Sequence, residues 1–391
     1  MSVTKAAGFS AAALAAGLKS SGKPDLALVV NSGPDFAAAG VFTRNRVRAA
    51  PVLWSEQVLA DGQLRAVILN SGGANACTGP DGFADTHRTA ELVADALRQA
   101  RGASVDVGAV DVGVCSTGLI GLRLPMDKIS AGITELVPQL SGGGGQAAAE
   151  AIMTTDSVPK QASFADEGWS VGGMAKGAGM LAPGLATMLV LITTDAVVDA
   201  DQLRGQLLEA CRTSFDRVDS DGCMSTNDTV ILMSSGASGV RPRPVDFQAA
   251  LNETCHDLAL QLLRDAEGAA HNIAITVRNA ASVADALTAG RACARNNLLK
   301  TALFGNDPNW GRVLAAIGTT DAAFEADQVD VTINGVTVCR GGSIGDPREG
   351  VDLTGRAITI DVDLRAGAEQ ATIWTNDLSV AYVHENSAYS T

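Results

Sequence analysis

Short apolar runs with the composition of β-strands alternate along this chain with longer segments in which apolar residues recur at helical spacing. The strand-like runs are residues 26–31, 66–70, 112–116, 187–193, 229–233 and 273–277. The helix-like segments are residues 83–100, 200–213, 246–266 and 283–303. From about residue 329 the pattern changes to strands alone, at 329–338, 357–364 and 371–383. The alternation predicts a mixed, layered α/β protein.

Composition narrows the possible functions of the 391-residue chain. Hydrophobic residues make up 46% and charged residues 18%, which is typical of a compact folded enzyme. A net charge of −14 argues against nucleic acid as a partner. The N-terminus has no secretion signal and no long apolar run follows it, so we expect no membrane span and a cytoplasmic location. The four histidines and seven cysteines lack metal-site spacing, which predicts no metal.

Domain boundaries are weakly marked. We expect a main sheet-and-helix body that runs to about residue 270 and is rejoined by the C-terminal strands. A smaller α/β unit is expected from about 270 to 350. The glycine run at 142–145 is interpreted as a surface linker before a helix.

The segment from Lys176 to Ala186 is a loop rich in glycine and proline that leads directly into an apolar strand at Thr187. Thr187 has two interpretations. As a β-branched residue it can simply begin a buried strand. If the bond after Ala186 is cut, however, Thr187 gains a free α-amine that can activate its own hydroxyl as a nucleophile. Gly184 and Pro183 suit the second interpretation, because they allow the strained backbone that self-cleavage requires.

The same loop superficially resembles a phosphate-binding loop. The order of residues argues against this, because Lys176 precedes its glycine and the chain continues to a strand, not a helix. We find no dinucleotide fingerprint either. The sequence therefore predicts no nucleotide cofactor.

Several segments together resemble the ornithine acetyltransferases, the glutamate N-acetyltransferases of arginine biosynthesis. Those in the first half are 41–43, 70–79, 116–121, 153–156 and 176–196, with Lys176-Gly-Ala-Gly-Met180 and Ala186-Thr187-Met188-Leu189 in the last. Those in the second half are 225–229, 266–269, 304–312 and 385–391. The resemblance covers essentially the whole chain.

The resemblance implies roles for individual residues. Thr187 would be the nucleophile that carries the acetyl group, and Thr117 with Gly118 would form the oxyanion hole. The substrate contacts would be Thr154, Lys176, Thr187, Glu267, Asn386 and Thr391. Of these, Lys176 suits a carboxylate and Glu267 an amine.

The resemblance also implies a reaction and an assembly. The acetyl group of N-acetylornithine would pass to glutamate by a cofactor-free ping-pong mechanism, and acetyl-CoA as a second donor is left open. Self-cleavage between Ala186 and Thr187 would give an N-terminal chain, 1–186, and a C-terminal chain, 187–391. Two copies of each would form a cytoplasmic heterotetramer. The implied fold is the layered α/β type shared with self-processing aminopeptidases.

Two positions depart from the family pattern. His271 stands where lysine is common, and it is expected to alter a contact behind the site. Gly184 follows Pro183 where serine, asparagine or aspartate is common, so it bears on the rate of self-cleavage.

Two rival functions stay open. An aminopeptidase or amidase would use the same nucleophile but let water resolve the acyl-enzyme. A non-catalytic binding protein for an acidic amino acid would stay uncut and form no acetyl-enzyme.

Overall fold

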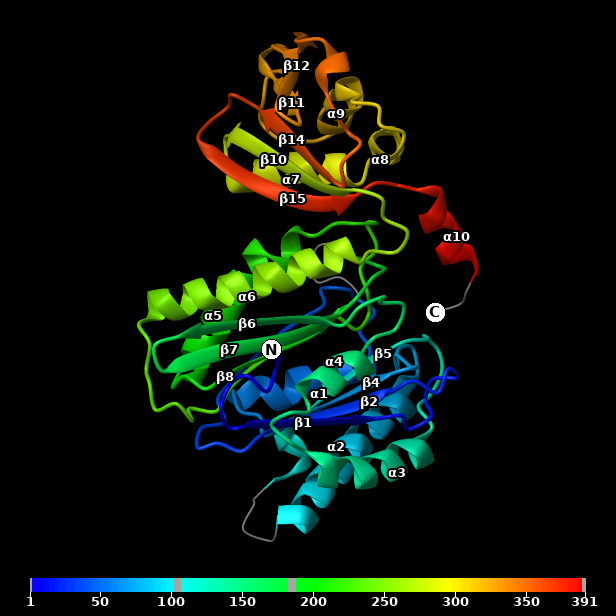
Figure 1. The fold of residues 1–391 in the computed structure, drawn as a ribbon, viewed down its shortest axis with the longest axis vertical. Coiled ribbons are helices and arrows are strands. Elements are labelled where there is room, and N and C mark those ends of the chain that lie inside the picture. The colour runs from blue at the N-terminus through cyan, green and yellow to red at the C-terminus, as the bar shows by residue number, and fades with distance from the viewer. Residues whose placement is uncertain (1, 102–106, 182–187, 389–391) are drawn as a thin grey trace.

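The computed structural model describes residues 2–101, 107–181 and 188–388, and it contains three β-sheets (Figure 1). The first sheet has the order β1 (Phe9–Leu14), β2 (Leu26–Asn31), β4 (Ala66–Ser71), β5 (Val112–Thr117). The second has the order β3 (Ala38–Phe42), β9 (Thr229–Ser234), β8 (Leu189–Thr194), β7 (Trp169–Lys176), β6 (Lys160–Asp166). Each of these two sheets contains one parallel pair, β4 with β5 in the first and β8 with β9 in the second.

Strand β8 shows why the two sheets stack. All six of its residues are buried. Leu189 and Leu191 pack into the core shared with the first sheet, whereas Val190 and Ile192 pack into the core beneath the helices on the other side. Because successive side chains of a strand point to opposite faces, a strand that is apolar throughout needs a covering layer on both sides.

Helices complete the layers. They are α1 (Ala50–Val58), α2 (Gly79–Arg101), α3 (Met126–Leu136), α4 (Gly145–Ala151), α5 (Ala200–Thr213) and α6 (Pro244–Arg264). Helices α5 and α6 cover the outer face of the second sheet, and α2 and α3 lie under the first (Figure 1). The main body is therefore an α–β–β–α sandwich, which confirms the predicted fold class. None of the described helices is long and apolar enough to cross a membrane.

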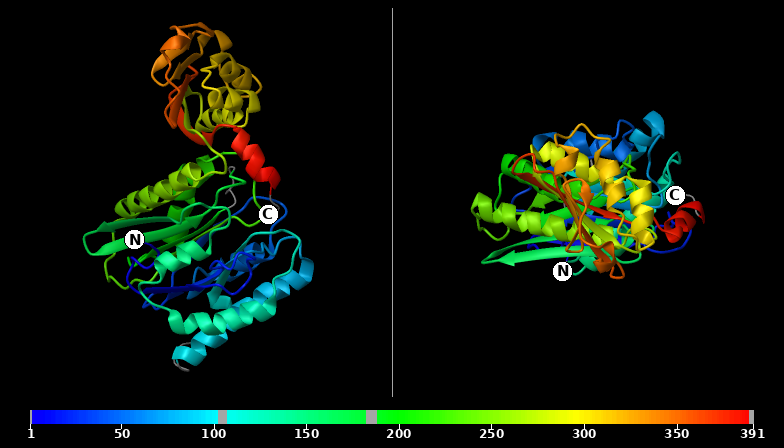
Figure 2. Two further views of the ribbon diagram at one scale, coloured as in Figure 1. Left: turned by 45° about the vertical axis from the view of Figure 1, so that its right-hand side comes forward. Right: turned by 90° about the horizontal axis from the view of Figure 1, so that it is seen from above.

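The third sheet forms a smaller unit with its own core at one end of the molecule (Figure 2). Its strand order is β13 (Ser343–Ile344), β12 (Val336–Arg340), β11 (Asp330–Ile333), β14 (Ala357–Asp363), β10 (Asn272–Ala280), β15 (Glu369–Asn376). The remaining helices are α7 (Val283–Ala294), α8 (Asn297–Phe304), α9 (Trp310–Ile317) and α10 (Val380–Ala388).

We expect from the sequence that the C-terminal strands rejoin the sheets of the main body, and this prediction is wrong. Instead β14 and β15 pair with β10 on its two sides, so the smaller unit extends from 272 to 376. An alternating pattern identifies a strand but does not say which strand it pairs with.

Three expected elements are divided in the structure. The helix predicted over 283–303 is two helices, with Asn296 capping the second through the Leu299 amide. The strand predicted over 329–338 is a hairpin that turns at Asn334 and Gly335, both with positive φ. The strand predicted over 371–383 ends at residue 376 and is followed by α10.

Candidate active site

A pocket of about 480 Å³ opens where the ends of β5 and β7 meet the segment before β9. Six residues assigned to the site from the sequence line it: Thr117, Gly118, Thr154, Lys176, Glu267 and Asn386. The other predicted positions, Ala186, Thr187 and Thr391, lie outside the described residues, as does Gly184. The structure thus brings together, around one cavity, every predicted site residue that it describes.

Strand β5 ends in a tight turn at Gly118. This residue has φ 126°, and a Cβ here would lie 2.6 Å from the Gly73 nitrogen. The Thr117 carbonyl accepts hydrogen bonds from the amides of Gly72 and Gly73, at 2.9 and 3.0 Å. Glycine is required at 118 for both the φ and the close approach, so backbone packing fixes the position of the turn.

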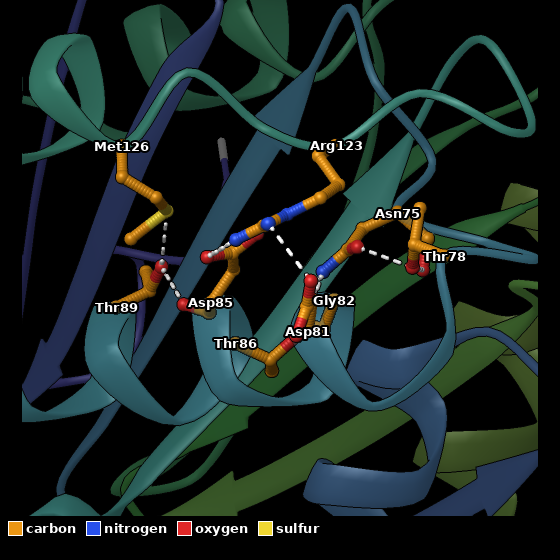
Figure 3. Close-up of polar contacts among 9 residues, drawn as sticks. All are labelled: Asn75, Thr78, Asp81, Gly82, Asp85, Thr86, Thr89, Arg123 and Met126. Carbon is orange, nitrogen blue, oxygen red and sulfur yellow. Dashed lines mark hydrogen bonds and ion pairs between the residues drawn. The ribbon is translucent and has the colours of Figure 1, made fainter.

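A side-chain clamp at the start of α2 holds the loop that packs against this turn (Figure 3). Asn75 has φ 49°, a conformation that asparagine tolerates, and its amide nitrogen donates to the Gly82 carbonyl at 2.8 Å. Thr78 Oγ1 donates to Asn75 Oδ1 at 2.7 Å. The adjacent Ala74 amide donates to the Leu119 carbonyl at 2.9 Å, which connects the clamp to the turn.

The segment after Gly118 is also bonded to helix α2. Arg123 donates through Nε and Nη2 to the two carboxylate oxygens of Asp85, at 2.8 and 2.7 Å (Figure 3). Asp85 is almost fully buried, whereas Arg123 is half exposed. This two-point contact orients the chain as it leaves the pocket.

Lys176 ends β7 and is buried beneath the pocket, with 1% of its surface exposed. Its ammonium nitrogen donates to Thr117 Oγ1 at 3.2 Å. Burial lowers the pKa of Lys176, whereas the charges of Asp156 and Asp228 act to raise it. Because Lys176 is buried, water does not screen its interaction with these carboxylates.

Asp156 organises the wall around Lys176. Its Oδ1 accepts from Lys160 Nζ and from the Gly177 amide, both at 2.6 Å, and its Oδ2 accepts from the Thr154 amide at 2.9 Å. Burial acts to raise the pKa of Asp156, but Lys176 and Lys160 outweigh it and lower this pKa to about 2. One carboxylate thus fixes the backbone at Thr154 and at Gly177, the residue after Lys176.

Glu267 reaches the pocket from the turn after α6. Its Oε1 accepts from Thr155 Oγ1 at 2.8 Å, and its amide donates to the Ala178 carbonyl at 2.9 Å. A Cβ on Gly179 would lie 2.6 Å from Glu267 Oε2. The glycine-rich loop therefore has a packing role, since the absence of a side chain at 179 lets Glu267 approach.

Asn386 reaches the pocket from α10, which lies apart from the sheets (Figure 1). Its side chain is exposed and donates to the Tyr382 carbonyl at 3.0 Å. None of the described residues of α10 is buried. The helix is therefore held by few contacts.

His271 does not line this pocket among the residues described. It is buried and pairs with Asp377, with 2.8 Å between Nδ1 and Oδ2, and its backbone amide donates to the other carboxylate oxygen at 3.0 Å. The contact lies immediately before β10, which begins at Asn272. The pair thus anchors the chain between the Glu267 turn and β10 to Asp377, which follows β15.

Lys19 is a pocket residue that the sequence reasoning missed. It lies in the turn-rich segment between β1 and β2, where no periodic pattern marks a site. Its ammonium donates to the carbonyls of Pro24 at 2.8 Å and Ala151 at 3.3 Å. Burial lowers the pKa of Lys19 to about 8, although Asp25 acts to raise it.

The segment Ser225, Thr226 and Asn227 also lines the pocket. The sequence marked this segment as similar to the family but gave its residues no role. With Lys19, Lys176 and Glu267 on the wall, the pocket offers charges of both signs and several hydroxyl groups. Such a lining is suited to a small zwitterionic ligand with a further charged group.

Comparison with known proteins gives a consistent result over the full length. The ArgJ family model matches residues 10–391. The arginine biosynthesis bifunctional protein ArgJ of Streptomyces coelicolor is 62% identical over 390 residues, and the match covers 100% of both chains. The protein of the same name from Thermobifida fusca is 59% identical over 391 residues, again with 100% of each chain covered.

A solved structure is similar in sequence to half of the chain. It is that of ornithine acetyltransferase complexed with ornithine, from Mycobacterium tuberculosis. The sequence identity is 63% and the TM-score is 0.45, over 48% of this chain and 96% of that one.

Proposed function

The chain belongs to the ArgJ family of arginine biosynthesis, and on this premise we propose that it transfers the acetyl group of N-acetylornithine to glutamate. One observation carries the proposal. A single pocket is lined by all six described residues for which the resemblance implies a role in this reaction. Its lysines suit the carboxylates of the two substrates, and Glu267 suits the side-chain amine of ornithine.

In the proposed first half-reaction, Thr187 Oγ1 attacks the acetyl carbonyl carbon of N-acetylornithine. The α-amine of Thr187 takes the hydroxyl proton and delivers it to the leaving nitrogen, so that ornithine departs and an acetyl ester remains. Thr117 and the Gly118 amide would stabilise the oxyanion. Lys176 supports this role, because donation to Thr117 Oγ1 leaves the hydroxyl hydrogen free to point at the substrate.

In the second half-reaction, the amine of glutamate attacks the acetyl ester. The ester C–O bond breaks, the Thr187 hydroxyl recovers its proton, and N-acetylglutamate leaves. The reaction needs no net oxidant or reductant and no bound cofactor. Both substrates carry an α-carboxylate and differ in the terminal group, so one pocket with charges of both signs can accept them in turn.

We propose that Thr187 gains its α-amine by self-cleavage. Attack of its hydroxyl on the Ala186 carbonyl moves the acyl group from nitrogen to oxygen, and water then cleaves the ester. The α-amine so formed has a reference pKa of about 7.7–8.0, which suits a general base near neutral pH. Before the cut the same nitrogen is an amide and has no such capacity.

The two fragments would remain together after the cut. Strand β8 from the second fragment pairs with β7 from the first, and β9 pairs with β3 in the same way. Separating the fragments would therefore break the backbone hydrogen bonds of two strand pairs in one sheet and expose the buried faces of that sheet. A heterotetramer with two copies of each fragment, located in the cytoplasm, completes the proposal.

Following a labelled acetyl group tests the proposed reaction. N-acetylornithine labelled in its acetyl group is incubated with the protein, with and without glutamate. The proposal predicts labelled N-acetylglutamate when glutamate is present and little free acetate when it is absent. Release of the label mainly as free acetate would favour the amidase alternative. Label that stays in N-acetylornithine would favour a binding protein. Labelled acetyl-CoA in a parallel reaction shows whether this chain accepts a second donor.

A further inference from the structure

Asn227 connects the two stacked sheets at the pocket. Its side-chain amide nitrogen donates to the Ser116 carbonyl at 2.8 Å and to the Ala74 carbonyl at 2.7 Å. Ser116 is in β5, one residue before Thr117, and Ala74 belongs to the loop that packs on the Gly118 turn. Asn227 is buried, so both of its donor hydrogens are used within the protein.

The next residue, Asp228, holds the start of β8. Its Oδ1 accepts from the Met188 amide at 3.1 Å. The Thr229 amide donates to the Met188 carbonyl at 3.1 Å. Both backbone groups of Met188, the first described residue after Thr187, are therefore hydrogen-bonded. Asp228 is fully buried.

We propose that Asn227 and Asp228 form one positioning unit, which sets the separation between the Thr117–Gly118 turn and the backbone that follows Thr187. Asn227 holds the turn through Ser116, and Asp228 holds the nucleophile's strand through Met188. The inference rests on the proposed function, because that function gives Thr117, Gly118 and Thr187 their roles. In such a reaction a displacement of about 1 Å between nucleophile and oxyanion donors lowers the rate on the order of 100-fold.

The hydrogen bonds of Asn227 connect the two fragments that the proposed cut would produce. Asn227 and Asp228 belong to the fragment that begins at Thr187, whereas Ala74 and Ser116 belong to the other fragment. The hydrogen bonds of Asn227 thus provide a register between the two fragments that does not depend on the Ala186–Thr187 bond. The geometry of the site would therefore survive self-cleavage.

The chain offers a matched control at the other end of β9. Asn31 is as buried as Asn227, and its amide nitrogen also bridges the two sheets, through the carbonyls of Ser234 and Asp35 at 3.0 Å each. It lies away from the residues that line the pocket. Asn31→Asp and Asn227→Asp therefore remove equivalent structural bonds, and only the second affects the proposed unit.

The test compares Asn227→Asp, Asp228→Ala and Asp228→Asn with Asn31→Asp and the unmodified chain. Self-cleavage is followed by fragment mass, acetyl transfer by kcat and KM, and folding by urea midpoint. We expect Asn227→Asp and Asp228→Ala to lower kcat on the order of 100-fold while KM changes by no more than about threefold. Asp228→Asn keeps an oxygen acceptor for Met188 and should retain kcat within about tenfold.

Two results would overturn the inference. One is kcat within about threefold of the unmodified chain in both Asn227→Asp and Asp228→Ala. The other is an equal loss of kcat in Asn31→Asp, which would make the effect a general consequence of weaker sheet packing. If Asn227→Asp does not fold, the contrast between Asp228→Ala and Asp228→Asn decides. If the unmodified chain transfers no acetyl group, the proposed function itself is wrong, and this result is distinct from the two above.

Discussion

Lys176 Nζ lies 3.2 Å from Thr117 Oγ1, so the lysine predicted to bind substrate directly contacts the threonine predicted to bind the oxyanion. The two residues come from the ends of β7 and β5, in different sheets. Substrate binding and oxyanion stabilisation are therefore expected to be coupled through this contact.

The coupling can be measured by a double-mutant cycle. Thr117→Val removes the hydroxyl and should lower kcat by about 10²–10³-fold, and Lys176→Met should lower it through the same hydroxyl. The double variant should lose much less than the product of the two effects, because both act on one interaction. Thr117→Ser, which keeps the hydroxyl, is the control. Independent, multiplicative losses would contradict the coupling.

Asp156→Asn should destabilise the fold and weaken substrate binding together. The change removes one of the two carboxylates that pair with buried Lys160, and Asp265 remains, so the cost in the free energy of unfolding should be about 1–3 kcal/mol. It also loosens the backbone at Thr154, so KM should rise. Urea unfolding and steady-state kinetics check the two effects. Asp95→Asn, which breaks an exposed pair with Arg98, should cost no more than about 1 kcal/mol.

The same carboxylate predicts an acid-sensitive stability. The pKa of Asp156 is about 2 in the folded protein against an ordinary value of 3.8, so the unfolded chain binds more protons between these values. The stabilisation is complete above the ordinary value and is lost as the pH falls from about 4 towards 2. Denaturation midpoints measured across this range should fall less steeply in Asp156→Asn than in the unmodified chain.

Lys19 predicts a pH dependence on the alkaline side. Its pKa of about 8 means that the ammonium loses its charge within the range of a kinetic assay. If Lys19 attracts a substrate carboxylate, KM for glutamate should rise as the pH increases through about 8, and Lys19→Met should have a high KM that is flat with pH. Lys23→Met, an exposed lysine four residues away, should behave as the unmodified chain does. An unchanged alkaline rise in Lys19→Met would exclude Lys19 as its cause.

Gly179→Ala should impair binding of N-acetylornithine more than of glutamate. The new Cβ would meet Glu267 Oε2 at 2.6 Å and push the carboxylate away from the predicted amine subsite. KM for N-acetylornithine reports the effect. Gly205→Ala is the control, because Gly205 is in α5 with nothing within 4 Å of its added Cβ. That substitution should stabilise the helix by about 0.5–1 kcal/mol and leave both KM values unchanged.

The sequence predicted the class of fold and most of its elements, because buried strands and amphipathic helices have distinct periods. Strand β2 and helix α5 have the predicted bounds. Pairing was harder to predict: β14 and β15 join β10 through contacts distant in sequence, which no local pattern encodes.

Prediction of the candidate site had the same limit, because local patterns do not show which residues meet in the folded chain. The six predicted residues that line the pocket came from resemblance over the whole chain, since a threonine at a strand end or a glutamate after a helix has no distinctive local pattern. Lys19, Asp156, Asn227 and Asp228 were given no role, because their importance lies in which backbone groups they contact in the folded chain.

The C-terminal tail offers a separate test of the site. Deleting residues 386–391 removes Asn386 and Thr391 but costs little packing, since none of the described residues of α10 is buried. We expect acetyl transfer to be abolished while cleavage at Thr187 and the urea midpoint stay close to those of the full chain. Full activity after truncation would remove the tail from the site.

Intact-mass analysis before and after brief exposure to N-acetylornithine tests the central claim, that Thr187 is both the cleavage point and the nucleophile. The unmodified chain should give fragments of 186 and 205 residues, with one acetyl group added to the fragment that begins at Thr187. Thr187→Ala should remain a single chain without the adduct. A single chain from the unmodified protein, or an acetyl group on another residue, would contradict the account.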